Sequence, residues 1–308
     1  MKNGFPYVLL LLLYGVLVRW VVPAGCVFGS ETDWLSQHVA LAETIRTACL
    51  SQHTLLPDWI ALGGGANGFQ FAYYGFLRPD VIVGCLFPTL SMTVIFCTYT
   101  ILFGGLSVLL CYRWLRCEGF ARGISTLCSI FFMTAGAMFH WHRQIMFVND
   151  LPFLLLAFIA LRIGRKWALP LLIFALCTSS FYYAPACLIV LAWYWFRLEG
   201  WRFWRKWMGS AILGCGMAAM LLLPTACVLL EHRAGSAGNI SWKALFLPDV
   251  QLSGLPMASV CRWWGFTHFW SGWQIDIGGR TVCFCLRLQR CHWQAFCSMV
   301  RFMHGRKF

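Results

Sequence analysis

The chain has 308 residues, of which 60% are hydrophobic and 11% charged, and its formal net charge is +13 at pH 7. Roughly a quarter of the residues in a soluble globular protein are charged, so this composition, with a mean hydropathy of +0.68, excludes an ordinary soluble domain. Lys and Arg occur in short clusters between apolar runs and form no extended stripe, so we expect no nucleic-acid partner. The sequence therefore predicts a multi-pass protein in contact with membrane lipids.

The first apolar run covers residues 5 to 24, with Lys2 before it and acidic residues after it. It is too long for a typical signal peptide, so we predict an uncleaved helix with the amino terminus inside the cytoplasm. The sequence Ala24-Gly25-Cys26 leaves a lipoprotein cleavage site as the rival interpretation. Arg19 lies deep in this run and must reach the interface or face other helices, because a lipid-facing charge there costs a few kcal/mol.

A polar loop over residues 29–80 follows, and we expect this outer loop to carry the function. It contains five of the eleven acidic residues of the chain: Glu31, Asp33, Glu43, Asp58 and Asp80. Residues 33–49 carry apolar side chains at helical spacing, which predicts an amphipathic helix along the membrane surface. The glycine-rich residues 63–68 lack the Lys and Ser/Thr of a P-loop, which favours a plain turn over a phosphate-binding nest.

Later apolar runs supply the remaining spans. Pro79 and Pro88 divide the run that ends at Tyr112 into a short dipping segment and a full helix from about Leu90. Further spans are expected near residues 124–139, 151–161, two short arms within 168–196 that turn near 179–183, and 208–230. By this count the fold is all-α: a polytopic transmembrane helix bundle of about seven spans with a helical first outer loop.

After residue 256 the composition changes, so we expect a membrane region over residues 1–256 and an atypical tail over residues 257–308. The tail has seven Arg or Lys residues, one acidic residue and five cysteines, without a hydrophobic period. We interpret it as a frameshift artefact beyond which further helices are missing. Most of the sixteen cysteines lie in or beside apolar runs, while Cys26 and Cys49 of the outer loop either pair or stay free.

Two stretches resemble the bacterial YfhO-type multi-pass membrane proteins. The first comprises Glu31-Thr32-Asp33-Trp34-Leu35-Ser36-Gln37-His38, Leu62-Gly63-Gly64-Gly65-Ala66-Asn67 and Tyr73-Tyr74-Gly75-Phe76-Leu77-Arg78-Pro79. The second is Phe139-His140-Trp141-His142-Arg143-Gln144, with Asn149 and Asp150 close behind. The resemblance extends over residues 1–255 and, because such proteins are usually much longer, corresponds to an amino-terminal portion.

This family is similar to the GT-C glycosyltransferases, membrane enzymes that take a sugar from a polyprenyl-phosphate donor. Its members are linked with glycosylation of cell-envelope polymers such as lipoteichoic acid. The resemblance implies a GT-C-like fold and hexosyl transfer on the outer face of the bacterial cytoplasmic membrane. It also implies an acidic residue of the first outer loop as base or as ligand of a divalent cation. Asp33 matches that position best, whereas Asp58 and Arg78 depart from the expected pattern.

The residues themselves fit this chemistry, because sugar transfer needs a base near the acceptor hydroxyl and cations near the leaving phosphate. The candidate catalytic residues are Asp33 and Glu31. The candidate substrate-binding residues are Gln37, His38 and Asn67 for sugar hydroxyls and His140, His142 and Arg143 for the phosphate.

Simpler interpretations stay open for each of these residues. Glu31 and Asp33 would also cap the surface helix. His140 and His142 would also suit the interface, or form a zinc site with Asp33, although nothing fixes its ligand spacing. Arg143 would also serve as an interface anchor or as a salt-bridge partner of Asp33.

Two other functions compete with the enzyme. One is a transporter or flippase for a lipid-linked substrate, and the other is a truncated, non-functional remnant. Charges buried within spans would favour transport. The sequence places only Arg19 within a span and offers it no paired acid, so it favours the enzyme.

Overall fold

The computed structural model describes residues 4–22, 28, 34–74, 76–135, 145–233, 276–277 and 280–281. The chain divides into two compact units, Met1–Ser241 and Trp242–Phe308. Within the second unit the structure describes an antiparallel ribbon of β3 (Asp276–Ile277) and β4 (Arg280–Thr281). The rest of the predicted tail lies outside the described residues, so its interpretation as an artefact stays a prediction.

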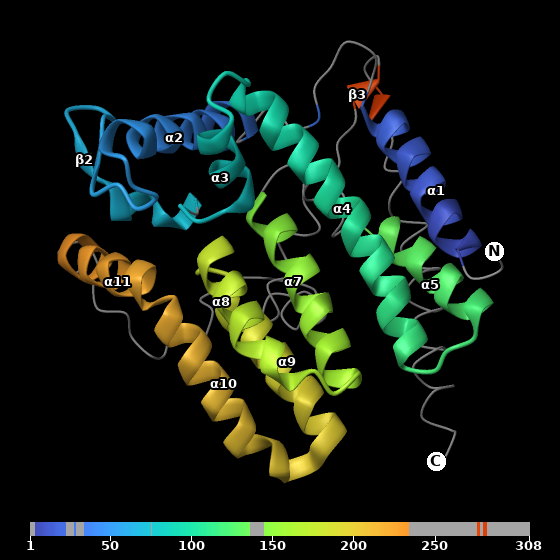
Figure 1. The fold of residues 1–308 in the computed structure, drawn as a ribbon. Helices are drawn as coiled ribbons and strands as arrows, with labels where there is room; N and C mark the ends of the chain where they lie inside the picture. The colour runs from blue at the N-terminus through green and yellow to red at the C-terminus, as the bar shows by residue number, and fades with distance from the viewer. Residues whose placement is uncertain are drawn as a thin grey trace, which may run out of the picture. The chain divides into compact units, whose positions relative to one another are not determined.

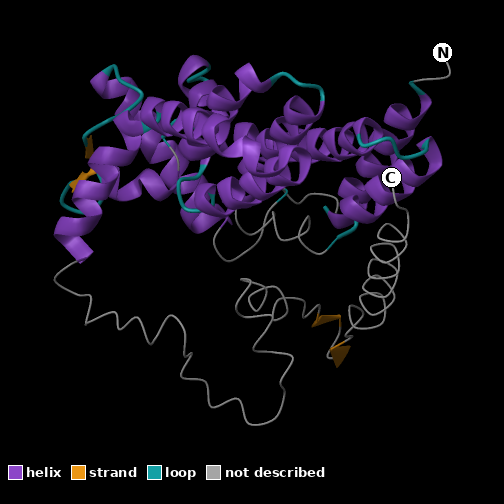
Figure 2. Cartoon of the chain, turned by 90° about the horizontal axis from the view of Figure 1, so that it is seen from below, coloured by secondary structure: helices purple, strands orange, loops and turns teal. Residues whose placement is uncertain are grey.

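Helices make up most of the described first unit, which confirms the predicted helical fold class (Figures 1 and 2). In chain order they are α1 (Phe5–Val21), η1 (Trp34–Val39), α2 (Ala40–Gln52), η2 (Gly68–Tyr74), α3 (Pro79–Leu86), α4 (Met92–Cys117), α5 (Arg122–Met133), α7 (Ile145–Arg162), η4 (Lys166–Ala168), α8 (Leu169–Ser179), α9 (Ala184–Glu199), η5 (Gly200–Arg202), α10 (Phe203–Met217) and α11 (Ala219–Arg233). A short antiparallel ribbon, β1 (Trp59–Ile60) with β2 (Ala66–Asn67), lies between α2 and η2 and was not expected from the sequence.

Helix α4 is the element against which α7, α5 and α1 pack. Figure 1 shows α7 on one side of α4, with α1 and α5 on the other. The 26 residues of α4 extend over ~39 Å at about 1.5 Å per residue, which exceeds the ~30 Å hydrocarbon core of a bilayer.

By length and composition, one or two helical segments among the described residues could cross a membrane. Among the described residues, α4 is long and apolar enough to span, and a second, bent candidate continues on both sides of Ala218. The apolar helices α1, α5 and η4 with α8 are shorter. The predicted total of seven spans therefore stays a prediction.

The proline-rich segment before α4 breaks as the sequence predicts. Pro79 occupies the first turn of α3, where its missing N–H would have no intrahelical partner in any case. Helix α3 ends at Leu86, shortly before Pro88, and α4 starts at Met92. The predicted turn near residues 179–183 is also present, between α8 and α9.

The predicted last span, residues 208–230, is not one straight helix. It breaks at Ala218, where the flanking helices bend by 70°. Gly214 and Gly216 weaken the end of α10, and Gly214 packs so closely that a Cβ there would lie 2.6 Å from Cγ2 of Ile173. Helix α11 then packs against η2. Apolar residues continue through the break, so the hydropathy pattern alone predicted a single helix.

Residues 34–86, here called the loop lobe, form a small folded structure with its own core. The buried residues of this core, with four from α4 and one from α11, are Trp34, Val39, Ala42, Ile45, Ala48, Cys49, Ile60, Ala72, Phe76, Val81, Met92, Ile95, Phe96, Tyr99 and Leu221. The amphipathic helix predicted over residues 33–49 is thus present as η1 and α2. Its apolar face is buried against protein, so this face is not available to lie in the membrane surface.

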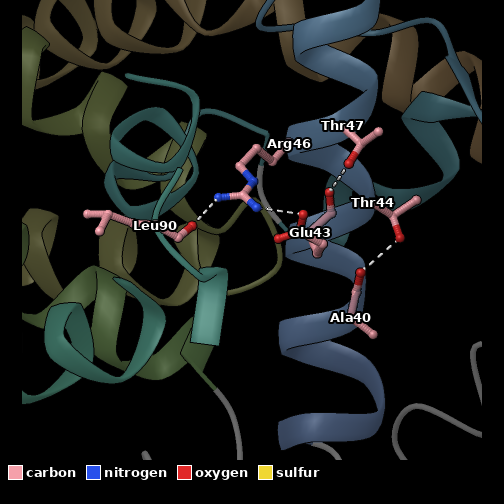
Figure 3. A network of polar contacts seen from close by, with 6 residues as sticks. All are labelled: Ala40, Glu43, Thr44, Arg46, Thr47 and Leu90. Carbon is pink, nitrogen blue, oxygen red and sulfur yellow. Dashed lines mark hydrogen bonds and ion pairs between the residues drawn. The ribbon is translucent and has the colours of Figure 1, made fainter. Parts of the chain in front are cut away.

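A polar network fastens α2 to the segment before α4 (Figure 3). The Arg46 guanidinium donates from Nη1 to the Leu90 carbonyl and from Nη2 to Oε1 of Glu43, each at 2.6 Å. Gly84 of α3 leaves room for this side chain, because a Cβ there would lie 3.2 Å from Cδ of Arg46. The hydrogen bond to Leu90 therefore ties α2 to the segment that leads into α4, while the ion pair with Glu43 stays within α2 and orients the guanidinium.

Candidate functional site

Five of the eight predicted site residues lie outside the described residues: Glu31, Asp33, His140, His142 and Arg143. Their roles, and a zinc site built from the histidines with Asp33, therefore stay predictions. The other three, Gln37, His38 and Asn67, belong to the loop lobe. Within the described ranges, no group of three His, Cys, Asp or Glu side chains could hold a metal ion.

Gln37 and His38 lie on η1, close to Tyr74 of η2. The Tyr74 hydroxyl donates to Oε1 of Gln37 at 3.2 Å, and the Gln37 side chain is exposed. His38 is buried, with its ring 5.6 Å from the Tyr74 ring and 6.5 Å from the Trp34 ring. Gln37 thus has the exposed surface that a sugar contact requires, whereas His38 is enclosed by aromatic rings.

Asn67 has a local structural role at the end of the β1–β2 ribbon. Its Oδ1 accepts a hydrogen bond from the Phe69 N–H at 2.9 Å, which closes a tight turn. Gly65 adopts φ +101° beneath Trp59, and a Cβ there would lie 2.6 Å from the indole Nε1. The glycine-rich stretch is therefore the turn of a β-hairpin, which agrees with the favoured interpretation as a turn.

A buried ion pair lies at the start of α3 within the loop lobe. Arg78 and Asp80 are 1% and 0% exposed, and they form a bidentate contact. The distances are 2.9 Å from Nε to Oδ1 and 2.6 Å from Nη2 to Oδ2. Asp80 sits in the first turn of α3, where the helix dipole stabilises an anion. The Arg78 guanidinium also lies 5.2 Å from the centre of the Phe96 ring.

Tyr99 of α4 lies near this pair and connects α4 to α7. The Tyr99 hydroxyl donates a hydrogen bond to Oδ1 of Asn149 on α7. Tyr99 is also close enough to Arg78, Asp80 and Asp150 for their charges to act on it. Asn149 and Asp150 are 0% and 3% exposed. We call these five residues, Arg78, Asp80, Tyr99, Asn149 and Asp150, the buried polar network.

The buried polar network contains atoms with unused hydrogen-bonding capacity. Within the part of the chain that the structure describes, both carboxylate oxygens of Asp150, Nδ2 of Asn149 and Nη1 of Arg78 have no hydrogen-bond partner. Native proteins leave few such atoms, so each one calls for a ligand, an ordered water or a catalytic role as its explanation. Chemically, Asp150 can accept a proton or a hydrogen bond from a hydroxyl group, and Arg78 can donate a hydrogen bond from Nη1.

Phe96 of α4 joins the start of the loop lobe to this network. The fully buried Trp34 packs its ring 4.7 Å from the Phe96 ring, and the Arg78 guanidinium contacts the same ring. Trp34 directly follows Asp33 in the sequence. Trp34, which follows the predicted catalytic Asp33, is thus separated from the Arg78 guanidinium by the side chain of Phe96.

Sequence reasoning missed the network because its members come from α3, α4, α7 and the residue before α3. Taken alone, the sequence assigns Asp80 to the polar loop and Asp150 to the surroundings of the histidine cluster. One available signal was the setting of Asp150, which precedes eleven uncharged, largely apolar residues (151–161). An ionisable residue within an apolar helix is a functional candidate by default.

Comparison with known proteins identifies one family. The family model described as "Bacterial membrane protein YfhO" matches residues 5–250 of the chain. No curated protein matches the sequence. No solved structure matches it either. The match covers the loop lobe, the buried polar network and all the helices of the first unit.

Proposed function

Because the chain belongs to the YfhO family of bacterial membrane proteins, we propose that it is a GT-C-like glycosyltransferase of the cytoplasmic membrane. The donor is a polyprenyl-phosphate-linked sugar, and the acceptor is a hydroxyl of an envelope polymer, such as lipoteichoic acid, or of a lipid on the outer face. The family match is the observation that carries the proposal. It confirms the resemblance seen in the sequence motifs, which end within the matched residues.

In this reaction the acceptor oxygen attacks C1 of the sugar, and the bond between C1 and the phosphate oxygen breaks. The acceptor proton passes to a carboxylate, and polyprenyl phosphate leaves. Asp33, with Glu31 beside it in the sequence, is the proposed base. His140, His142 and Arg143 are proposed to hold the leaving phosphate, Arg143 through its two-pronged guanidinium.

Two features of the loop lobe support these roles. Trp34 is fully buried, so the chain is anchored one residue after the proposed base. Gln37, three residues later, presents an exposed amide beside Tyr74 and suits a sugar hydroxyl. Asp150 and Arg78 add a buried acceptor and a buried donor, and we assign them to the wall of the same site.

The test is sugar transfer by purified protein in proteoliposomes that contain radiolabelled polyprenyl-phosphate glucose and an envelope-polymer acceptor. Asp33→Asn should abolish transfer and leave insertion and expression unchanged. Asp58→Asn is the matched control, because Asp58 is an exposed acid of the same loop lobe. Full activity of the Asp33 variant would reduce that residue to a helix cap, and no transfer by the wild type with any sugar donor would refute the enzyme.

A transporter of lipid-linked substrates is the second candidate, and one observation favours it. The sequence led us to expect Arg19 as the sole charge within a span and no paired acid. Instead, Arg19 is exposed and donates to the Val22 carbonyl at 3.1 Å, while Arg78, Asp80 and Asp150 are buried. Buried ionisable groups within helix bundles mark transport paths as well as active sites.

Acceptor-free proteoliposomes distinguish the two candidates. A transporter moves fluorescent polyprenyl-phosphate glucose between leaflets without any acceptor, and Asp150→Asn should slow that movement. The enzyme transfers sugar only when acceptor is added and leaves the lipid in its original leaflet. Movement by the wild type without acceptor would therefore replace the first proposal by the second.

A further inference from the structure

The corner between α9 and α10 is the most strongly basic surface in the described chain that the proposed reaction does not use. Between residues 163 and 206 there are six basic residues and one acidic residue, Glu199. Four arginines of this region are exposed: Arg165, Arg197, Arg202 and Arg205. In Figure 1 the corner is the turn at which α9 passes into α10.

Glu199 holds two ammonium groups at this corner. Lys166 of η4 contacts its Oε1, and Lys206 of α10 lies 2.9 Å from its Oε2. The hydrogen bond from Lys166 is the main cause that lowers the pKa of Glu199 to about 2, so the carboxylate stays charged at neutral pH. The acid thus neutralises one of the two lysines and fixes both positions, which leaves the corner with a net positive charge.

A glycine turn and aromatic packing shape the backbone of the corner. Gly200 adopts φ +60°, a left-handed conformation that lets the chain turn sharply after α9. Below the turn, the buried Trp195 ring lies 6.3 Å from the Trp207 ring and 6.4 Å from the Phe203 ring. These contacts anchor the backbone of η5 and α10 that carries the basic residues.

Exposed tryptophans are interleaved with the basic residues. Trp201, Trp167, Trp193 and Trp204 are 82%, 73%, 58% and 54% exposed. The Arg197 guanidinium lies 5.4 Å from the centre of the Trp193 ring. Tryptophan concentrates at the headgroup level of a bilayer, and basic clusters beside it attract anionic lipids.

By contrast, the basic end of α4 lacks this combination. Trp114 is partly buried there and donates to the Tyr194 hydroxyl at 3.1 Å, and Arg116 donates to the Phe120 carbonyl.

We propose that the α9–α10 corner binds the phosphate headgroups of anionic phospholipids in the adjacent leaflet. The arginines and lysines contact the phosphates, and the tryptophan rings insert beside the glycerol region. The site depends on membrane residence and not on sugar transfer.

Native mass spectrometry of the full-length protein in detergent tests this site, with phosphatidylglycerol and phosphatidylcholine of matched acyl chains as probes. The wild type should retain phosphatidylglycerol in preference to phosphatidylcholine. Arg202→Gln and Arg205→Gln should each weaken phosphatidylglycerol binding roughly fivefold and leave phosphatidylcholine unchanged. Trp201→Ser should weaken both lipids alike, because it removes the uncharged contact.

Arg19→Gln is the matched control, since Arg19 is an exposed arginine far from the corner in the sequence. It should leave phosphatidylglycerol binding unchanged. Equal retention of the two lipids by the wild type, or an equal loss in the Arg19 and Arg202 variants, would overturn the proposal. So would complete displacement of phosphatidylglycerol by inorganic phosphate, because the site would then recognise a free anion instead of a lipid.

Discussion

The ion pair of Arg78 with Asp80 and the cluster of Glu199 with its two lysines differ in solvent exposure and in what the loss of one partner costs. The first is sealed from solvent at 1% and 0% exposure, whereas the Glu199 side chain is 21% exposed and its lysines more so. A buried pair loses the hydration of both charges, so removing one partner leaves the other without compensation. A surface pair keeps most of its hydration and is worth little. The same kind of contact therefore lies buried at the start of α3 in one place and positions exposed cations in the other.

The comparison is tested most severely by Asp80→Asn. This change leaves the buried Arg78 guanidinium without its anion, and we expect a loss of about 3–5 kcal/mol in the free energy of unfolding. Denaturant unfolding of the purified protein in detergent measures it. The double change Arg78→Met with Asp80→Leu should recover most of that loss. A single-variant loss below about 1 kcal/mol would mean that water reaches the pair.

Asp150→Asn should have the opposite profile, a functional effect without a large cost in stability. Neither carboxylate oxygen has a hydrogen-bond partner among the described residues, so the change breaks no such bond. We expect the free energy of unfolding to stay within about 1 kcal/mol of the wild type or to rise, because burying an unpaired charge is unfavourable. Sugar transfer should fall at least tenfold. A clear loss of stability with full activity would make Asp150 a structural residue.

Glu199→Gln should have the smallest effect, at most about 1 kcal/mol at neutral pH, because solvent screens the pair. The pKa of Glu199 is lowered to about 2 in the folded protein, below its ordinary value of 4.5. Its contribution is therefore present above pH 4.5 and is lost as the pH falls toward 2. Thermal unfolding should show the wild type and the variant converging across this window. Convergence at higher pH, or none, would contradict the assignment.

The sequence predicted the elements whose signals are local. Pro79 and Pro88 gave the break before α4, and the apolar spacing after Asp33 gave the helix η1 and α2. The sequence did not predict the elements whose form depends on tertiary packing. The bend at Ala218 lies inside continuous apolar sequence, and the β1–β2 strands are two residues long, too short to show alternation.

The residues of the candidate site also fall into two groups, those recognisable from the sequence and those brought together only by helix packing. Gln37 and Asn67 were recognisable as polar residues of a loop, although Asn67 turned out to close a turn. The contact of Tyr99 with Asn149 joins residues 50 positions apart and follows from how α4 packs on α7. No spacing rule connects such residues, so the buried polar network appeared only once the helices were assembled.

The contacts of Phe96 restrict how the start of the loop lobe can move relative to α4. Trp34 packs against its ring, and Arg78 contacts the same ring. A hinge motion that lifted the start of the loop lobe from α4 would break the edge-to-face contact between Trp34 and Phe96. It would thereby remove the support of the ring that lies against the buried Arg78 guanidinium. The start of the loop lobe and α4 should therefore move as one rigid body, and any gate that admits substrate should be formed by other elements.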